Sequence, residues 1–422
     1  MGKRKVKVKK KSILLVVIIV VLIGSFIVFF LMNNNSSEGI KSNNTKSKEE
    51  KEITDFKGMT ISEAKKYLES KSISFDIDYD YNDEIEKDIV IESTKNDDSF
   101  KILVSLGSIP LDKFKENKVN ELGNVPIMMY HGIVNTTDNK YTGGNVDKDG
   151  YNRTSKAFLE DLEMYYSKGY RMIRLKDYID GNIDVELGKS PIILTFDDGN
   201  ENNFKVIKKE SDGTLVFDEN SAIGVLEKIK KKYPDMNVTA TFFLNGGLCN
   251  QKEYNEDIMK WLIDHGYDIG NHTISHVDFT KIGIDKTKYE VGALYQKLEN
   301  VIPDKYVNIV ALPFGSPYKK THSNYEYILN GEYDGFEYHT EAALRVGWEA
   351  EVSPFNKNFD KTFLKRIRAY DNNGKEFDIE MNFKLLEKSR FISDGNKNLI
   401  TIPKSSESNL SETKIKVVTY EE

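Results

Sequence analysis

The sequence predicts an α/β fold whose main domain, residues 119–422, is built on a parallel sheet or barrel. The prediction rests on hydrophobic strand segments that alternate with helical segments along this part of the chain. The strand segments are rich in aliphatic and aromatic residues and span 125–130, 191–196, 238–244 and 307–312. The helical segments lie between them and span 155–168, 221–232 and 257–265. Side chains at the carboxyl ends of such strands are the first candidates for chemistry.

The N-terminus predicts a membrane anchor. Residues 1–12 are strongly basic and residues 13–32 are apolar and uncharged. An apolar helix of about 20 residues spans a bilayer, and its basic flank stays in the cytoplasm. A cleaved signal peptide is the alternative, but its apolar region would be shorter and would end in small residues. Residues 33–52 are polar and predict a flexible linker. We therefore expect a single-pass protein with its main domain outside the cytoplasm.

A small α+β module is predicted for residues 53–107. The Thr60 side chain can cap the start of a helix by accepting from the Glu63 amide, and the Glu63 side chain can accept from the Thr60 amide in return. Strands are indicated by hydrophobic alternation from Phe75 and again from Lys101. The residues Asp55-Phe56-Lys57-Gly58-Met59-Thr60, together with Val104-Ser105-Leu106-Gly107, resemble a PASTA domain. That family is associated with binding peptidoglycan fragments, so the resemblance implies a wall-binding module; a simple spacer is the alternative.

Charge and cysteine content exclude other classes. The formal net charge is −7, which argues against a nucleic-acid partner because such a role needs a broad basic surface. Cys249 is the single cysteine, so the chain can form no internal disulfide. We expect its thiol to be buried as a small apolar group.

Two adjacent carboxylates follow a predicted buried strand. Asp197 and Asp198 come directly after Thr195-Phe196 and precede Gly199. Neighbouring carboxylates against apolar walls repel each other unless a cation is present. One aspartate could bind a metal ion while the other acts as a base. A polar turn is the alternative, because Asp-Asp-Gly is a common turn composition.

Two histidines complete a candidate metal site. His272 and His276 are four residues apart, a spacing that we interpret as one face of a helical turn. Two exposed histidines on a polar turn are the alternative. With Asp198 they make a set of two imidazoles and one carboxylate that leaves a coordination position open, as a hydrolytic metal site requires.

These segments resemble one enzyme family. Thr195-Phe196-Asp197-Asp198-Gly199, Ala240-Thr241-Phe242-Phe243, His272-Thr273-Ile274-Ser275-His276 and Leu312-Pro313-Phe314-Gly315 are similar to motifs of the polysaccharide deacetylases, the NodB-homology family or carbohydrate esterase family four. The resemblance spans residues 124–402. It implies a distorted (β/α) barrel and hydrolysis of N-acetyl groups from amino sugars.

The resemblance also implies roles for single residues. Asp197 would be the general base, and the metal ligands would be Asp198, His272 and His276. The backbone amide of Phe314, beside Pro313, would help to hold the oxyanion. Trp348 could line a sugar or acetyl pocket, with core packing as the alternative.

Two departures from the family pattern matter. The third motif normally begins with an arginine that orients the base, but this chain has Ala311 there; Arg345 and Arg174 are candidate substitutes. A late Leu-x-x-His motif, the usual source of the general acid, is absent from the sequence. Tyr130-His131 resembles the corresponding motif of the poly-N-acetylglucosamine deacetylase branch, which implies His131 as the acid; an ordinary hydrogen-bonded histidine is the alternative.

The sequence therefore predicts a divalent-metal deacetylase of peptidoglycan, acting on N-acetylglucosamine or N-acetylmuramic acid. Zinc is the expected ion, with cobalt, nickel or manganese as alternatives. A deacetylase of extracellular poly-N-acetylglucosamine is the second enzyme hypothesis, suggested by His131. A wall-binding protein with an inactive enzyme domain is the hypothesis of another class, suggested by Ala311.

Overall fold

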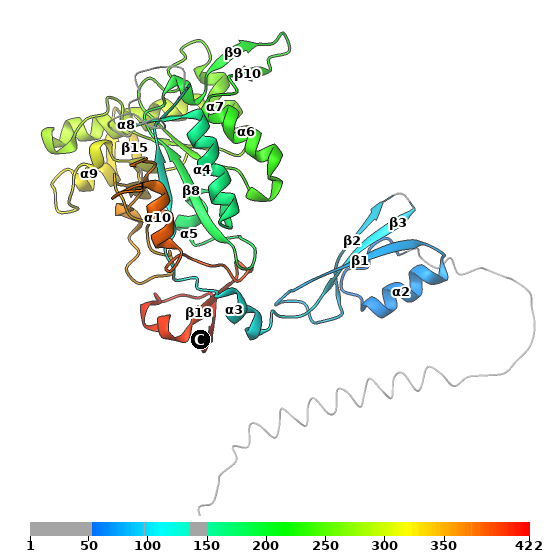
Figure 1. Ribbon diagram of the computed structural model, residues 1–422. Helices are drawn as coiled ribbons and strands as arrows, with labels where there is room; N and C mark the ends of the chain where they lie inside the picture. Colours follow the sequence, from blue (N-terminus) through cyan, green and yellow to red (C-terminus); the bar gives the residue numbers. More distant parts are fainter. Residues whose placement is uncertain (1–52, 97, 136–150, 373) are drawn as a thin grey trace, which may run out of the picture. The chain divides into compact units, whose positions relative to one another are not determined.

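The computed structural model describes residues 53–96, 98–135, 151–372 and 374–422 (Figure 1). Its described residues divide into two compact units: one runs to Asp80 and includes residues between Asp88 and Ser105, and the other comprises Tyr81–Lys87 and the described residues from Leu106 to Glu422. The predicted basic tail, membrane helix and linker lie outside the described residues. Within the described ranges, we find no helix both long and apolar enough to cross a membrane.

The smaller unit consists of one helix on a three-stranded sheet. Its elements in chain order are α2 (Ile61–Ser70), β1 (Ser74–Asp80), β2 (Val90–Asn96) and β3 (Ser99–Ser105). β3 is the central strand, parallel to β1 and antiparallel to β2. The predicted capping box is confirmed: the Glu63 amide donates to the Thr60 hydroxyl, and the Thr60 amide donates to the Glu63 carboxylate. The apolar core lies between α2 and the sheet and includes Leu68 and Phe100.

A curled parallel sheet organises the larger unit. Its strands, in spatial order, are β16 (Ala342–Leu344), β13 (Ile309–Ala311), β12 (Asp268–Asn271), β11 (Thr241–Leu244), β8 (Ser190–Phe196), β4 (Ile127–Tyr130) and β17 (Ile367–Arg368). An eighth strand, β7 (Tyr170–Met172), pairs with the first half of β8. Every pairing in this sheet is parallel. The predicted α/β fold with a parallel sheet is therefore confirmed.

The two edges of the sheet meet just before β17. The Leu364 amide donates to the Ala343 carbonyl at 2.8 Å, and the Arg345 amide donates to the Leu364 carbonyl at 2.8 Å. Ala343 belongs to one edge strand, whereas Leu364 leads directly into the other. These bonds fix the segment that carries Arg366 against both edges, which gives the distorted barrel its closure.

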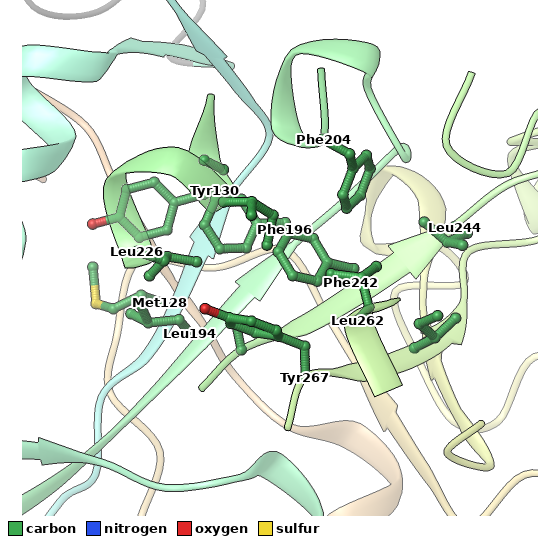
Figure 2. Packing of buried hydrophobic residues seen from close by; sticks show 14 of the residues in the cluster. Met128, Tyr130, Leu194, Phe196, Phe204, Leu226, Phe242, Leu244, Leu262 and Tyr267 are labelled. Atoms are coloured by element: carbon green, nitrogen blue, oxygen red, sulfur yellow. The ribbon is translucent and has the colours of Figure 1, made fainter. Parts of the chain in front are cut away.

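Strands of the sheet are buried on both faces. In β8, Leu194 and Phe196 face the helices, whereas Ile193 points into the second core inside the curl. Two-sided burial explains why the sequence shows continuous hydrophobic runs rather than strict alternation. On the helix side the rings of Tyr130, Phe196 and Phe242 stack across β4, β8 and β11, with centroid separations of 5.3 and 4.9 Å (Figure 2). This row packs neighbouring strands together just before their carboxyl ends.

Helices cover the sheet and connect its strands. In chain order they are α3 (Leu111–Asn117), α4 (Ser155–Ser167), α5 (Leu175–Asp180), α6 (Ala222–Lys232), α7 (Asn255–Asp264), α8 (Ile284–Val301), α9 (Tyr325–Leu329) and α10 (Ile379–Leu386). The three helices predicted in this domain correspond to α4, α6 and α7, with ends shifted by one or two residues. Cys249 is buried, as predicted.

Four two-stranded sheets surround the barrel. They are β5 (Gly132–Val134) with β6 (Asn152–Thr154), β9 (Val206–Lys209) with β10 (Leu215–Phe217), β14 (Asn330–Tyr333) with β15 (Phe336–His339), and β18 (Leu399–Pro403) with β19 (Lys416–Tyr420). β5 begins one residue after His131, and β6 one residue after Tyr151. The parallel pairing of β5 with β6 therefore brings Tyr151 beside the end of β4.

Candidate active site

One cavity of about 270 Å³ collects the residues that the sequence singled out. It lies where β4, β8, β12 and β13 end, because parallel strands present their carboxyl ends at the same edge of a sheet. Its lining residues are His131, Tyr151, Asp197, Asp198, His272, His276, Leu312, Phe314 and Val346. Of the predicted site residues, Pro313 and Trp348 do not line this cavity.

Asp198, His272 and His276 form a candidate metal site. Oδ1 of Asp198 lies 3.2 Å from Nε2 of His272 and 3.4 Å from Nε2 of His276. One potential ligand atom from each of the three residues falls within 4.8 Å of the others. Nδ1 of His272 donates to the Ala311 carbonyl at 2.8 Å, so its Nε2 carries the lone pair. That Nε2 is buried and makes no hydrogen bond within the described ranges, which fits a metal ligand.

The backbone of the site is strained. Four residues other than glycine lie in the left-handed region: Asp198 (φ 76°), Thr273 (φ 67°), His276 (φ 51°) and Phe314 (φ 58°). Side chains with a Cβ rarely adopt this conformation, and such residues concentrate at functional sites. The predicted helical turn over His272–His276 is therefore wrong. The two imidazoles converge through a loop with two left-handed residues rather than through helical spacing.

Side chains clamp this histidine loop. The Asn271 side-chain oxygen accepts from the Thr273 amide at 2.8 Å, and the Thr273 hydroxyl accepts from the His276 amide at 3.0 Å. Glu290 of α8 is fully buried, and its carboxylate accepts from the Ser275 amide at 2.8 Å. These bonds replace the hydrogen bonds that a helix would have supplied, so they determine where the imidazoles point.

Asp197 is held by an arginine that sequence reasoning missed. The Arg366 guanidinium donates to both carboxylate oxygens of Asp197, at 2.8 and 2.7 Å. It also donates to the Thr195 hydroxyl at 3.1 Å and to the Arg345 carbonyl at 2.9 Å. Burial alone would raise the pKa of Asp197, but the charge and hydrogen bonds of Arg366 outweigh it and hold this pKa well below its usual range. Asp197 is therefore ionised and fixed in orientation.

Arg366 occupies the role that the sequence left open at Ala311. The expectation that Arg345 or Arg174 would fill it was wrong: the Arg345 guanidinium lies 4.6 Å from the Phe363 ring centroid, and Arg174 lies 3.7 Å from Asp268. Arg366 is 169 residues from Asp197 in the chain, outside any recognised motif. The sequence Arg366-Ile367-Arg368, an aliphatic residue between two arginines, was the one feature that could have indicated a buried arginine here.

His131 reaches the cavity from the end of β4. Its side chain is buried, and its ring lies 5.0 Å from the ring of Tyr151. Burial lowers the pKa of His131 to about 4, against the opposing charges of Asp197 and Asp198. The imidazole is therefore neutral at neutral pH.

The remaining predicted residues occupy different places. The Phe314 ring is exposed and lies 4.7 Å from the His276 ring, while Pro313 is buried beneath it. The Phe314 amide donates to no acceptor in the described part of the chain, which leaves it available to an oxyanion. Trp348 is not part of the cavity lining, and its ring packs against the guanidinium of Arg368.

A family model described as polysaccharide deacetylase matches residues 184–328. The chain carries a polysaccharide deacetylase domain. The matched segment contains Asp197, Asp198, His272, His276 and Phe314. His131 and Arg366 lie outside it.

Relatives of the deacetylase domain come from bacteria. A putative polysaccharide deacetylase, YxkH of Bacillus subtilis, is 23% identical over 203 residues, which is 47% of this chain and 59% of that protein. The peptidoglycan-N-acetylglucosamine deacetylase of Bacillus cereus is 35% identical over 77 residues, 18% of this chain and 27% of that protein. The matches thus span less than two thirds of either relative. Among solved structures, the Streptococcus pyogenes deacetylase PplD in complex with acetate covers 64% of this chain and 99% of that chain, with 18% identity and a TM-score of 0.45.

Removing Arg366 should destabilise the fold because the buried Asp197 carboxylate then has no counter-charge. We expect Arg366→Met to lower the free energy of unfolding by about 3–5 kcal/mol. Adding Asp197→Asn should recover part of this loss, because the uncompensated charge is then gone. Chemical denaturation of the two variants and the wild type measures the effect. Arg345→Met is the control and should cost about 1 kcal/mol or less. Equal losses for both arginine variants would contradict the assignment.

Weakening the clamp on the histidine loop should weaken metal binding. Glu290→Ala removes the acceptor of the Ser275 amide, and we expect zinc affinity to fall about 10- to 100-fold. Glu290→Gln keeps an acceptor oxygen and should fall less. Competition with a chromophoric chelator measures both. Glu299→Gln on the same helix is the matched control, since the Glu299 carboxylate accepts from the exposed amide of Asp304 near the far end of α8. A zinc affinity in Glu290→Ala equal to that of the control would exclude the clamp.

Proposed function

We propose that the protein is a metal-dependent carbohydrate N-deacetylase that removes acetyl groups from the amino sugars of peptidoglycan, N-acetylglucosamine or N-acetylmuramic acid. One observation carries the proposal: an ionised Asp197, oriented by Arg366, shares a cavity with Asp198, His272 and His276. The family match over residues 184–328 and the Bacillus cereus relative that acts on peptidoglycan N-acetylglucosamine support it.

Hydrolysis of an acetamide has three requirements that these residues meet. Water must lose a proton, and the ionised Asp197 accepts it. Negative charge on the former carbonyl oxygen must be stabilised, and the Phe314 amide at the cavity wall can donate to it. The leaving nitrogen must be protonated, and His131 is the candidate donor. The carbon–nitrogen bond then breaks, and the products are acetate and an amino sugar.

Asp198, His272 and His276 would hold the metal ion. A divalent ion bound by such a set supplies Lewis-acid polarisation of the amide carbonyl and lowers the pKa of a water molecule. Imidazole and carboxylate ligands in a site with an open position are typical of hydrolytic zinc sites, while cobalt, nickel and manganese accept the same donors. Zinc is therefore the proposed ion.

The protonation state of His131 sets the order of proton transfers. A buried imidazole with a pKa of about 4 carries no proton to spare before the reaction. His131 can protonate the amine only after it gains a proton within the site. That proton is the one that Asp197 removes from water. Its transfer through His131 to the leaving amine returns both side chains to their starting protonation states after one turnover.

A deacetylase of extracellular poly-N-acetylglucosamine is the second candidate. The placement of His131 at the end of β4, inside the cavity, favours it, because the Tyr130-His131 motif resembles that branch. An inactive wall-binding protein is less well supported. That hypothesis was based on the absence of an arginine at position 311, but Arg366 forms an ion pair with Asp197 instead.

We further propose that the enzyme works at the bacterial cell surface. Residues 13–32 would anchor it in the cell membrane, residues 33–52 would act as a tether, and the module over 53–107 would bind or reach the wall as a PASTA-like domain. The apolar run without charge and the basic residues before it support this arrangement.

Activity is tested by acetate release from purified peptidoglycan and from poly-N-acetylglucosamine. We expect the wild type to act on peptidoglycan, to lose activity with a chelator and to recover it with zinc. Asp197→Asn and His131→Ala should each lower kcat about 10²- to 10⁴-fold. His339→Ala, which changes an exposed histidine bonded to Asn330, is the control for His131. Full activity in Asp197→Asn would remove the proposed base, and a preference for the second polymer would favour the alternative substrate.

Location is tested by digestion of intact cells with an added protease. The deacetylase domain should be cleaved from outside, while a tag before residue 13 should stay protected. Deletion of residues 13–32 should release the protein from the membrane fraction. Protection of the domain in intact cells would contradict the surface location.

A further inference from the structure

The larger unit carries a few exposed aromatic side chains, and two of them line the cavity. Four of them are more than a third exposed among the described residues: Tyr151 (43%), Phe314 (53%), Tyr318 (59%) and Phe377 (41%). Tyr151 and Phe314 line the cavity itself, and Tyr318 follows Phe314 in the same loop. Exposed aromatic area is unfavourable in water, so its presence at the cavity indicates a surface that binds something.

A series of aromatic and guanidinium side chains in mutual contact extends from His131 to Phe377. The Tyr151 ring lies 5.0 Å from the His131 ring. The Arg368 guanidinium carbon lies 4.8 Å from the Tyr151 ring centroid and 4.6 Å from that of Trp348. Trp348 lies 4.7 Å from Phe377. Two aromatic rings thus sandwich one guanidinium, and a third extends the series away from the reacting centre.

The exposed Phe377 has an unfavourable backbone conformation. Its backbone is left-handed, with φ 65°, which a bulky residue rarely adopts. The neighbouring Asp378 fixes the loop, because its carboxylate accepts from the amides of Asn372 and Glu380 at 2.8 and 2.9 Å. A strained backbone that holds an aromatic ring half exposed does not favour folding. It is consistent with selection for binding.

We propose that Tyr151, Arg368, Trp348 and Phe377 form an extended subsite for the sugar residues that follow the deacetylated one along the glycan strand. A pyranose ring has an apolar C–H face that packs on aromatic rings and hydroxyl groups at its edge that accept hydrogen bonds from a guanidinium. The series offers both within reach of the cavity. The inference rests on the proposed function and adds which residues hold the part of the strand beyond the reacting sugar.

The test uses full-length protein and N-acetylglucosamine dimers and tetramers. In the wild type, kcat/KM for acetate release should rise from dimer to tetramer. In Phe377→Ala, the tetramer-to-dimer ratio should fall about five- to tenfold, the loss expected for one stacked ring. Trp348→Ala should give a similar fall if it folds; Phe377 is exposed, so its variant does not depend on core packing. Ile207→Ala, an exposed apolar residue on β9, is the control and should leave the ratio unchanged.

Binding separates this inference from the proposed function. Trp348 is one of two tryptophans in the chain, so a tetramer bound at the subsite should change the intrinsic fluorescence. The Kd for the tetramer should rise about five- to tenfold in Phe377→Ala. If the wild type releases no acetate but binds the tetramer in this Phe377-dependent way, the proposed function fails and the subsite stands. If acetate is released but Phe377→Ala leaves both the ratio and the Kd unchanged, the subsite is overturned.

Discussion

The bidentate pair between Asp197 and Arg366 is the interaction on which the site depends. Both side chains are buried, and an unpaired carboxylate in that position would either take up a proton or unfold its surroundings. The arginine comes from the segment that joins the two edges of the sheet. The same few residues therefore complete the barrel and fix the Asp197 carboxylate, so closure of the fold and order in the candidate site depend on one segment.

Local sequence patterns predicted the elements that end in functional residues. The strand before Asp197 and the helices α4, α6 and α7 could be located because hydrophobic periodicity is a local signal. The Asp-Asp and His-x-x-x-His segments could be found because their donors lie within a few residues. The shape of the histidine loop could not, since its left-handed residues depend on Glu290, which belongs to a later helix.

Residues that act across the fold escaped sequence reasoning. Arg366 and Tyr151 meet the site only through the pairing of β17 with β4 and of β5 with β6. Neither lies in the segment that matches the family model. His131 was found because it directly follows a hydrophobic strand. Arg366 lies before a strand of two residues, too short to give a periodic signal.

The closure of the barrel has a consequence for biosynthesis. Asp198, His272 and His276 have all emerged once the chain has been made as far as residue 276, whereas the partner of Asp197 appears ninety residues later. A truncated polypeptide that ends between residues 311 and 366 contains the three donor groups and the groups that hold them, but it leaves the Asp197 carboxylate without a counter-charge. Completion of the candidate site is therefore coupled to synthesis of the C-terminal third, so its charges are balanced only when the polypeptide is almost fully synthesised.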